Sequence, residues 1–212
     1  MKIGIITIHN SPNYGACLQA YALWKYISLL GQDCEVINLY RPHQVEYVKS
    51  NRFHPMRQST GLVAKAKHLA KSVLGISKAK PCGSLYSDKA KAKFDEFNLQ
   101  IKLSRPYAGI DELYAAPPEY DLYISGSDQL WNPTQPYCLE PYFLTFTPAG
   151  SKKISYATSI GITELTENEK KKFKAWLSSY VAVSVREKQA KKLLESFTGR
   201  SDIKQVPDPT FL

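Results

Sequence analysis

Apolar residues recur along the chain with two periods, one typical of strands and the other of helices. The apolar, β-branched or aromatic runs that predict strands cover residues 2–8, 33–39, 120–125, 142–146, 152–158, 181–185 and 203–206. The segments with apolar residues at helical spacing cover residues 15–30, 89–99, 164–180 and 187–197. Strands that alternate with helices predict a doubly wound α/β fold with a mostly parallel, Rossmann-like sheet.

The region from residue 41 to residue 105 is the least regular part of the chain. Within it, residues 62–74 form a basic amphipathic stretch, with Leu62, Leu69 and Val73 on one side and Lys65 and Lys71 among or opposite them. Such a stretch is typical of an ordinary surface helix, and it also fits a helix that rests on an anionic membrane surface. We therefore expect a single Rossmann-like domain over residues 1–212, with a basic helical insertion at about 41–105.

Length and composition are those of one large globular domain: 212 residues, 43% hydrophobic and 22% charged. No apolar run approaches the roughly 20 residues that a membrane span needs. The start, MKIGIITI, has no cleavage region and is too short for a signal peptide. The cysteines are scattered with no C-x-x-C pair, which argues against a zinc site or a disulfide framework. These features predict a reduced, cytoplasmic protein with no bound metal.

The formal net charge of +9 is unevenly distributed. Residues 41–105 and 152–200 are rich in Lys and Arg, whereas residues 106–150 contain neither. A positive field favours acidic partners such as phosphates, nucleotides or anionic lipid. A solvated, lysine-rich surface explains the same charge equally well. The chain has no nucleic-acid-binding motif, so nucleic acid is not an expected partner.

The densest group of polar side chains follows the strand predicted at residues 120–125. There the sequence YDLYISGSDQLWNP breaks at Gly126 and continues with Ser127, Asp128, Gln129 and, after two more positions, Asn132. Ligands bind at the carboxyl edge of open α/β sheets, which is where this turn falls. The alternative is a purely structural turn, in which Ser127 or Asp128 caps the next helical turn.

A second polar loop, HNSPNYG, follows the first predicted strand. It has one glycine, so it matches neither the G-x-G-x-x-G fingerprint nor a Walker loop. The helix that begins after it can still hold an anion through its N-terminal N–H groups. Asn13, Tyr14 and Gly15 would then face the site. Alternatively, Asn13 caps the helix and Tyr14 packs against a neighbour.

Further polar residues lie at the ends of later predicted strands, namely Ser159, Arg186 and Asp208. A parallel sheet would bring them to one edge together with the two loops described above. The chain offers no recognisable Ser/His/Asp or Cys/His set, and His9 is the one histidine expected at this edge. The convergence of these residues predicts a binding site.

Several segments, in order, resemble the polysaccharide pyruvyl transferase family. They are IITIHNSPNYGACLQAYAL, YDLYISGSDQLWNP, YFLTF, KKISYATSIG, VSVRE and PDPTFL. The paired N-Y-G-A and G-S-D-Q-x-W-N signatures make the resemblance specific, and it extends from residue 1 to residue 212. Residues 41–105 carry no motif of the family.

The resemblance implies transfer of the enolpyruvyl unit of phosphoenolpyruvate to a saccharide, often as a ketal, in exopolysaccharide, capsule or cell-envelope biosynthesis. It implies phosphoenolpyruvate as the donor, no cofactor, a lipid- or nucleotide-linked saccharide acceptor, and possible peripheral contact with the inner face of the membrane. The fold would be similar to one half of a GT-B enzyme. Because PDPTFL resembles the end of the first half, we expect an N-terminal half that lacks the second and does not consume phosphoenolpyruvate alone.

Two residues are the candidates for catalysis under this resemblance. Arg186 is the best anion ligand, because a guanidinium binds carboxylate or phosphate with two parallel hydrogen bonds. Asp128 would hold or deprotonate an acceptor hydroxyl, unless it is only a turn residue. Trp131 would stack on a sugar face or pack in the core. The expected substrate-binding residues are Asn13, Tyr14, Gly15, Gly126, Ser127, Gln129, Trp131, Asn132 and Ser159.

Three other functions fit the same predicted fold. The first is a GT-B glycosyltransferase half that uses a nucleotide sugar. The second is a non-catalytic module that binds an anionic saccharide, and the third is a structural subunit at the membrane surface.

Overall fold

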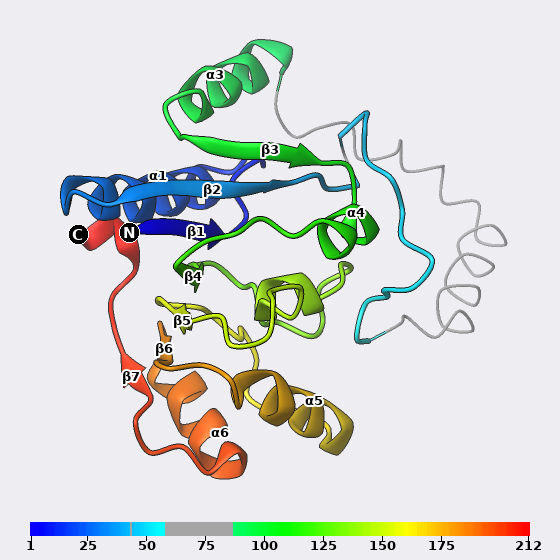
Figure 1. The fold of residues 1–212 in the computed structure, drawn as a ribbon, viewed down its shortest axis with the longest axis vertical. Coiled ribbons are helices and arrows are strands. Elements are labelled where there is room, and N and C mark those ends of the chain that lie inside the picture. The colour runs from blue at the N-terminus through cyan, green and yellow to red at the C-terminus, as the bar shows by residue number, and fades with distance from the viewer. Residues whose placement is uncertain (43, 58–86) are drawn as a thin grey trace, which may run out of the picture.

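A computed structural model of the protein describes residues 1–42, 44–57 and 87–212 (Figure 1). The basic amphipathic stretch at residues 62–74 lies outside the described residues, so the prediction of a surface or membrane-resting helix there stays a prediction. In the described part of the 41–105 region, residues 44–57 contain turns and bends but no helix or strand, whereas residues 87–105 contain a helix at Asp88–Asn98 and the start of a strand at Leu103.

Five parallel strands form the central sheet, in the spatial order β3-β2-β1-β4-β5. These strands are β1 Lys2–Ile6, β2 Asp33–Leu39, β3 Leu103–Tyr107, β4 Leu122–Ser125 and β5 Lys153–Ser155. A second, two-stranded parallel sheet pairs β6 (Ser184–Val185) with β7 (Lys204–Gln205). The predicted α/β class and Rossmann-like sheet are therefore confirmed.

The order of the strands reverses between β1 and β4. The chain runs outward from β1 to β2 and β3, and then returns to place β4 on the other side of β1, with Ile6 opposite Ser125. The loops that leave β1 and β4 consequently diverge at the carboxyl edge and open a crevice. In doubly wound sheets this topological switch point is the usual ligand site.

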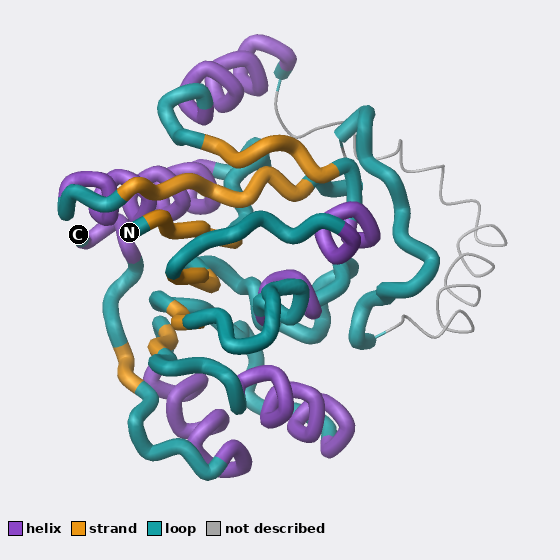
Figure 2. The backbone as a smooth tube through the Cα atoms, in the orientation of Figure 1, coloured by secondary structure: helices purple, strands orange, loops and turns teal. Residues whose placement is uncertain are grey.

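Helices surround the sheet, and long loops connect them (Figure 2). They are α1 Tyr14–Leu29, α3 Asp88–Asn98, α4 Ile110–Ala115, α5 Glu167–Leu177 and α6 Lys188–Thr198, with the short 3-10 helices η1 Glu140–Phe143 and η2 Pro209–Phe211. In Figure 1, α3 lies beside β3 at one end of the molecule, and α5 and α6 lie at the other. Gly31 ends α1 with a φ of +75°, as a C-terminal glycine does.

The prediction of a strand at residues 142–146 is wrong. Residues 140–143 form η1 instead, with Pro141 near its start and Leu144 in the left-handed region at φ 54°. Because residues 141–144 are all buried, the segment has no alternation of buried and exposed residues that would mark a strand.

The hydrophobic pattern also does not predict β3 or α4. Pro106 weakens the strand pattern of β3, yet it is tolerated because β3 is an edge strand.

Two apolar clusters make up the core. The smaller one holds side chains of β1, β2 and α1, among them Ile5, Val36 and Leu23. The larger one extends from β1 and β4 to α5 and α6, and includes Trp131 and Phe173. The clusters fix α1 and the loop after β4 against the sheet, and so they set the walls of the crevice at the switch point.

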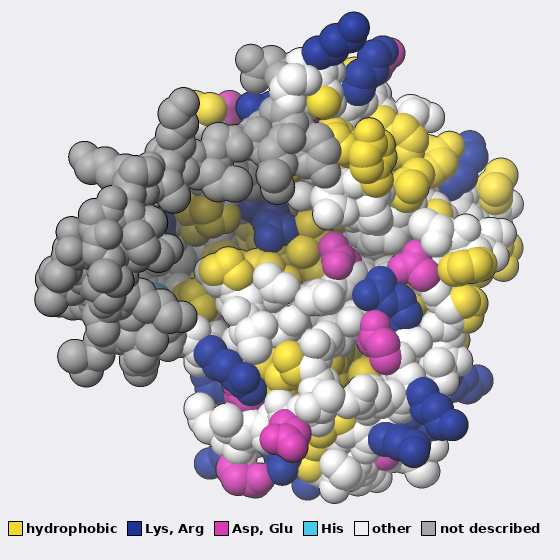
Figure 3. Space-filling model, turned by 180° about the vertical axis from the view of Figure 1, so that it is seen from behind, with side chains coloured by type: hydrophobic (Ala, Val, Ile, Leu, Met, Phe, Trp, Pro, Cys, Tyr) yellow, Lys and Arg dark blue, Asp and Glu magenta, His cyan; other side chains and the backbone are white. Residues whose placement is uncertain are grey.

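The surface carries basic and acidic side chains side by side. Figure 3 shows Lys and Arg spread over several parts of one face, interspersed with Asp and Glu. Among the helices in the described part of the chain, none is long and apolar enough to span a membrane.

Candidate functional site

A cavity of about 510 Å³ lies at the switch point. We call it the switch-point cavity; its lining residues are Asn13, Gly15, Ala16, Leu18, Gln19, Asp128, Arg186, Asp208, Thr210 and Phe211. They come from the start of α1, the loop after β4, the end of β6 and the segment that contains η2. The structure thus brings together residues from both ends of the sequence, as a parallel sheet should.

Arg186 is held at this cavity by two carboxylates. Its Nη1 donates to Asp208 Oδ2 at 2.9 Å, and its Nε donates to Glu187 Oε1 at 2.9 Å. Ser127 Oγ donates to the same Asp208 oxygen at 3.1 Å. We call these four residues the Arg186 cluster. Within the described residues Arg186 Nη2 has no hydrogen-bond partner, so it remains available to a ligand.

Asp208 connects the cluster to the C-terminal segment. Its Oδ1 accepts hydrogen bonds from the backbone N–H and the hydroxyl of Thr210, at 3.0 and 2.9 Å. Burial acts to raise the pKa of Asp208, but the hydrogen bonds from Thr210 and Arg186 prevail and lower it. Burial likewise acts to lower the pKa of Arg186, and its two acidic partners raise it instead. Both side chains therefore stay charged.

Asp128 combines a strained backbone with a partly buried carboxyl group. Its φ of 87° lies in the left-handed region, which non-glycine residues seldom adopt. Its Oδ1 accepts a hydrogen bond from the N–H of Gln129 at 2.7 Å. Burial raises the pKa of Asp128, outweighing the hydrogen bond from Gln129 and the charge of Arg186. Asp128 thus forms the turn and also lines the cavity. Strained backbone of this kind is common at functional sites.

The start of α1 forms the opposite wall. Asn13 caps the helix, because its Oδ1 accepts from the N–H of Ala16 at 3.1 Å, and it also lines the cavity with Gly15. Buried Gln19 donates to the carbonyl oxygens of Ile8 and Ala16, which fixes the loop after β1. The N-terminal end of α1 has no acidic residue in its first turn, so its dipole favours an anion in the cavity.

Tyr14 does not face the switch-point cavity. Its ring lies 4.8 Å from the ring of Phe94 on α3 and is 68% exposed. It lines a shallow apolar groove between α1 and α3, with Leu18 and Phe97. The alternative, in which Tyr14 packs against a neighbour, is the one that the structure shows.

Gly126 and Ser127 lie inside the protein, beneath the cavity. A Cβ atom at Gly126 would stand 3.1–3.2 Å from side-chain atoms of Thr7, Ile5 and Leu23, so this glycine allows β4 to pack closely. Ser127 is fully buried, and its hydroxyl donates to Asp208 of the site. Both residues position the site and do not line it.

Trp131 and Asn132 were expected to contact substrate, and the structure places both in the interior. The indole of Trp131 is fully buried and stacks on Phe143 at 4.7 Å, while its Nε1 donates to the carbonyl of Tyr142. A sugar cannot stack on this indole, because none of its surface is exposed. Asn132 is 5% exposed and holds the turn through bonds to Gln129 and Thr134.

Gln129 and Ser159 line a separate, smaller pocket of about 210 Å³ at the start of α6. Glu187, a member of the Arg186 cluster, lines it as well. The N–H of Ser159 donates to the carbonyl of Asp128 at 2.8 Å, which ties the two loops together. The predicted site residues that do line a cavity are therefore divided between two pockets, with Gln129 and Ser159 in the smaller one and Asn13, Gly15, Asp128 and Arg186 in the switch-point cavity.

Two residues that line the cavities at the carboxyl edge, Gln19 and Arg41, are missing from the predicted site. Asp208 was expected at this edge, and the structure adds that it binds Arg186. Gln19 is a polar residue on an apolar helix face, and Arg41 comes two positions after the end of β2, so the sequence pattern could have identified both.

His9, the histidine expected at this edge, is buried, and burial lowers its pKa. No group of three or more His, Cys, Asp or Glu in residues 1–42, 44–57 and 87–212 is placed to hold a metal ion.

Comparison with known families favours one of the candidate functions. The family model described as polysaccharide pyruvyl transferase matches residues 13–212. The chain belongs to the polysaccharide pyruvyl transferase family. No curated protein and no solved structure gives a match. The family indicates pyruvyl transfer in polysaccharide biosynthesis and implies a saccharide acceptor. The matched residues begin at Asn13, which caps α1, and include Asp128, Arg186 and Asp208.

Proposed function

We propose that the protein transfers the pyruvyl unit of phosphoenolpyruvate to two hydroxyl groups of a saccharide, forming a ketal, at the switch-point cavity. The observation that carries this proposal is that Asp128 and Arg186, one group able to take a proton and one able to bind an anion, line the same cavity beside a helix N-terminus. Family membership supplies the class of reaction.

The reaction needs both kinds of group. One saccharide hydroxyl attacks the central carbon of the enol, losing its proton while the methylene carbon gains one. A second hydroxyl then attacks the same carbon and gives its proton to the departing phosphate oxygen, the carbon–oxygen bond to phosphate breaks, and inorganic phosphate leaves. A base for the hydroxyl proton and cations for the carboxylate and phosphate lower the barriers of these steps.

Asp128 is the proposed base. Because burial raises its pKa, its carboxylate is a stronger proton acceptor than an ordinary aspartate. Arg186 is the proposed ligand of the donor. Asp208 and Glu187 fix two edges of its guanidinium, and Nη2 is left to donate to the incoming carboxylate or phosphate. The dipole of α1 assists the same anion.

We further propose a lipid- or nucleotide-linked saccharide as the acceptor and a cytoplasmic location, with contact to the inner face of the membrane where the acceptor is lipid-linked. The basic residues of the chain support this, because they favour anionic surfaces. Such contact should weaken with salt, since the Debye length is about 8 Å at physiological ionic strength.

The test is an assay of the full-length product of the gene with phosphoenolpyruvate and a saccharide acceptor. We expect inorganic phosphate to be released in proportion to the acceptor consumed, with a pyruvyl ketal visible by ¹³C NMR. Hydrolysis of a nucleotide sugar with phosphoenolpyruvate left untouched would instead identify a glycosyltransferase. Binding of anionic saccharides with no turnover of either donor would identify a non-catalytic module.

A further inference from the structure

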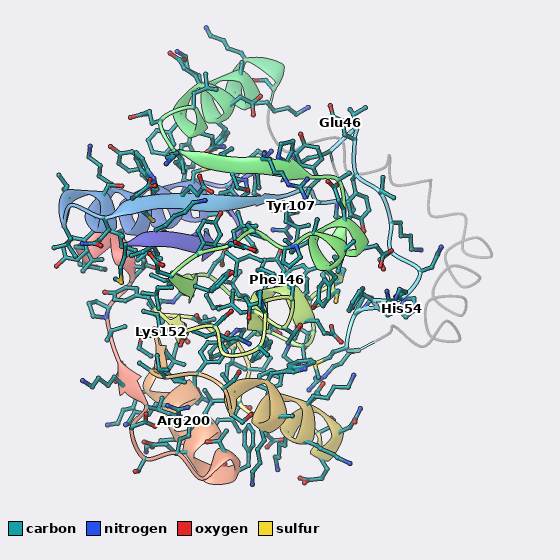
Figure 4. All side chains as sticks on the ribbon, in the orientation of Figure 1. Glu46, His54, Tyr107, Phe146, Lys152 and Arg200 are labelled. Atoms are coloured by element: carbon teal, nitrogen blue, oxygen red, sulfur yellow. The ribbon has the colours of Figure 1, made fainter. Side chains whose placement is uncertain are left out.

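A second cavity, of about 460 Å³, lies at the carboxyl end of β2, and the proposed reaction does not use it. It is bounded by the residues that follow β2, by part of residues 44–57 and by residues 136–142. We call it the basic pocket, because Arg41, Lys49 and His54 line it while no Asp or Glu among the described residues does. Figure 4 shows His54 on the side of the molecule toward which β2 and β3 point.

The basic side chains of this pocket, Arg41, Lys49 and His54, form no salt bridge with any other residue in the described part of the chain. The guanidinium of Arg41 instead lies over the ring of Tyr137, 4.9 Å from its centre. An arginine and a lysine without acidic partners among the described residues, together with a histidine, are suited to an anion that carries more than one negative charge.

Aromatic rings make up much of the rest of the wall. They are Tyr40, Tyr47, Phe53, Tyr137 and Tyr142. Cavities lined by rings with a few polar groups are typical of sites for organic ligands. Phosphoenolpyruvate is small, and it has no ring that would use such a wall. The combination of rings and cations fits a phosphorylated sugar better than it fits the donor.

The pocket is firmly built into the fold. Its outer wall is tied to the sheet, because Tyr40 N–H donates to the carbonyl of Tyr107 at 2.9 Å and Val48 N–H donates to that of Ala108 at 2.7 Å. Ser50 Oγ donates to Asp111 Oδ1 at 2.9 Å. Farther along, Arg57 forms two hydrogen bonds with the buried carboxylate of Glu169, at 2.6 and 2.8 Å.

Arg41 also links the basic pocket to the switch-point cavity. Its guanidinium lies over the ring of Tyr137, and the hydroxyl of Tyr137 donates to the carbonyl of Gln129, the residue after Asp128, at 2.9 Å. The charge of Arg41 also acts to lower the pKa of the Asp128 carboxyl, against the larger effect of burial. A ligand that extends from Asp128 to Arg41 would therefore occupy both cavities. We infer that the basic pocket binds the phosphorylated end of the acceptor saccharide, while the hydroxyl groups of the same acceptor lie at Asp128. This inference rests on the proposed function.

The test measures binding directly by isothermal titration calorimetry, with the full-length protein and with glucose 1-phosphate, glucose and phosphoenolpyruvate as separate probes. We expect Arg41→Ala and Lys49→Ala each to weaken binding of glucose 1-phosphate by about tenfold, because each removes a charged hydrogen bond to phosphate. Binding of phosphoenolpyruvate should be unchanged. Lys152→Ala is the matched control, since Lys152 lies far from His54 in Figure 4 and should have no effect.

Four outcomes would overturn the inference. They are no binding of glucose 1-phosphate at millimolar concentration, wild-type affinity in both variants, an equal loss in Lys152→Ala, or a loss that affects phosphoenolpyruvate instead. Lys49 is exposed, so Lys49→Ala keeps the test valid even if Arg41→Ala fails to fold. Uridine diphosphate glucose and geranyl diphosphate then distinguish the two sources of the phosphate; tighter binding of either one than of glucose 1-phosphate supports the inference and names the source.

Failure of this inference can be told apart from failure of the proposed function. A protein that binds glucose 1-phosphate through Arg41 and Lys49 but forms no pyruvyl ketal refutes the proposed function alone. A protein that forms the ketal, with wild-type binding in both variants, refutes only the assignment of the basic pocket.

Discussion

The switch-point cavity and the basic pocket differ in how their arginines are paired. Arg186 in the switch-point cavity donates to Asp208 and Glu187, so most of its charge is balanced within the protein. Arg41 in the basic pocket contacts the face of an aromatic ring and has no acidic partner within the described residues. A balanced arginine is well oriented but attracts anions weakly, whereas an unbalanced one attracts them strongly. The difference is consistent with the proposed division between chemistry at the first cavity and recognition at the second.

The largest expected effect comes from Asp128→Asn. Asparagine keeps the size of the side chain and tolerates the left-handed backbone at φ 87°, so the fold should persist. If Asp128 is the base, ketal formation should fall by about 10²–10⁴-fold. The measurement is the rate of phosphate release at saturating donor. Asp121→Asn, at the amino end of β4, is the control, and a variant of Asp128 that retains a near-normal rate would exclude this role.

Titration of the same carboxyl group should set the acid limb of the pH profile of kcat/KM. Because its pKa in the folded protein is raised above the ordinary 3.8, the base form is lost at a higher pH than for an exposed aspartate. We expect kcat/KM of the wild type to decline as the pH is lowered, with the midpoint of the decline at a pH above 3.8. The residual activity of Asp128→Asn should lack that decline. An acid limb that persists in the variant would assign it to another group.

Arg186→Ala should have the next largest effect. It removes charged hydrogen bonds worth about 1.5–3 kcal/mol each, so kcat/KM for the donor should fall by about tenfold to hundredfold. Arg186→Lys keeps the charge but loses the planar fork, and we expect it to recover only part of the loss. Early unfolding of Arg186→Ala with normal kinetics would show that the arginine serves only to hold the loops together.

Asp208→Asn tests the cluster through stability. The carboxylate accepts from Arg186, Ser127 and Thr210, and we expect the free energy of unfolding to fall by roughly 1.5–3 kcal/mol in urea titrations. Since the folded pKa of Asp208 is lowered, this stabilisation is present above about pH 3.8 and disappears as the pH falls through the folded pKa. The variant should be insensitive to that change.

The matched control for Asp208 is Asp202→Asn. Asp202 pairs with Arg200 and is 55% exposed, so its loss should change the free energy of unfolding by only about 0–1 kcal/mol. Equal losses in the two variants would mean that Asp208 is an ordinary surface partner.

Arg41→Ala should have a small effect on stability. The contact of its guanidinium with Tyr137 is worth about 0.5–1 kcal/mol, and no salt bridge to a described residue is broken. Urea unfolding should therefore distinguish it clearly from Asp208→Asn. Destabilisation as large as that of Asp208→Asn would show that both arginines are structural, and the contrast between the two cavities would disappear.

Much of the fold could be predicted from the sequence, because strand and helix periods depend on local side-chain order. The strand predicted at residues 33–39 coincides with β2, and the helix predicted at 15–30 coincides with α1 within one residue at each end. The segment at residues 142–146 could not be assigned in this way. A short apolar run fits a strand or a buried turn, and the burial of Phe143 was decided by packing against Trp131 and Phe173, which are distant in the sequence.

For the site, the sequence determined which loops would meet, since parallel strands place their carboxyl ends at one edge. Asn13, Asp128, Arg186 and Asp208 follow from that rule alone. Only the tertiary structure decided which side chains face the cavity. Trp131 and Tyr14 have the same chemical suitability for sugar contact, yet one is enclosed by Phe143 and the other rests on Phe94. Local sequence fixes where a turn occurs, whereas the direction of a side chain depends on neighbours that come from distant parts of the chain.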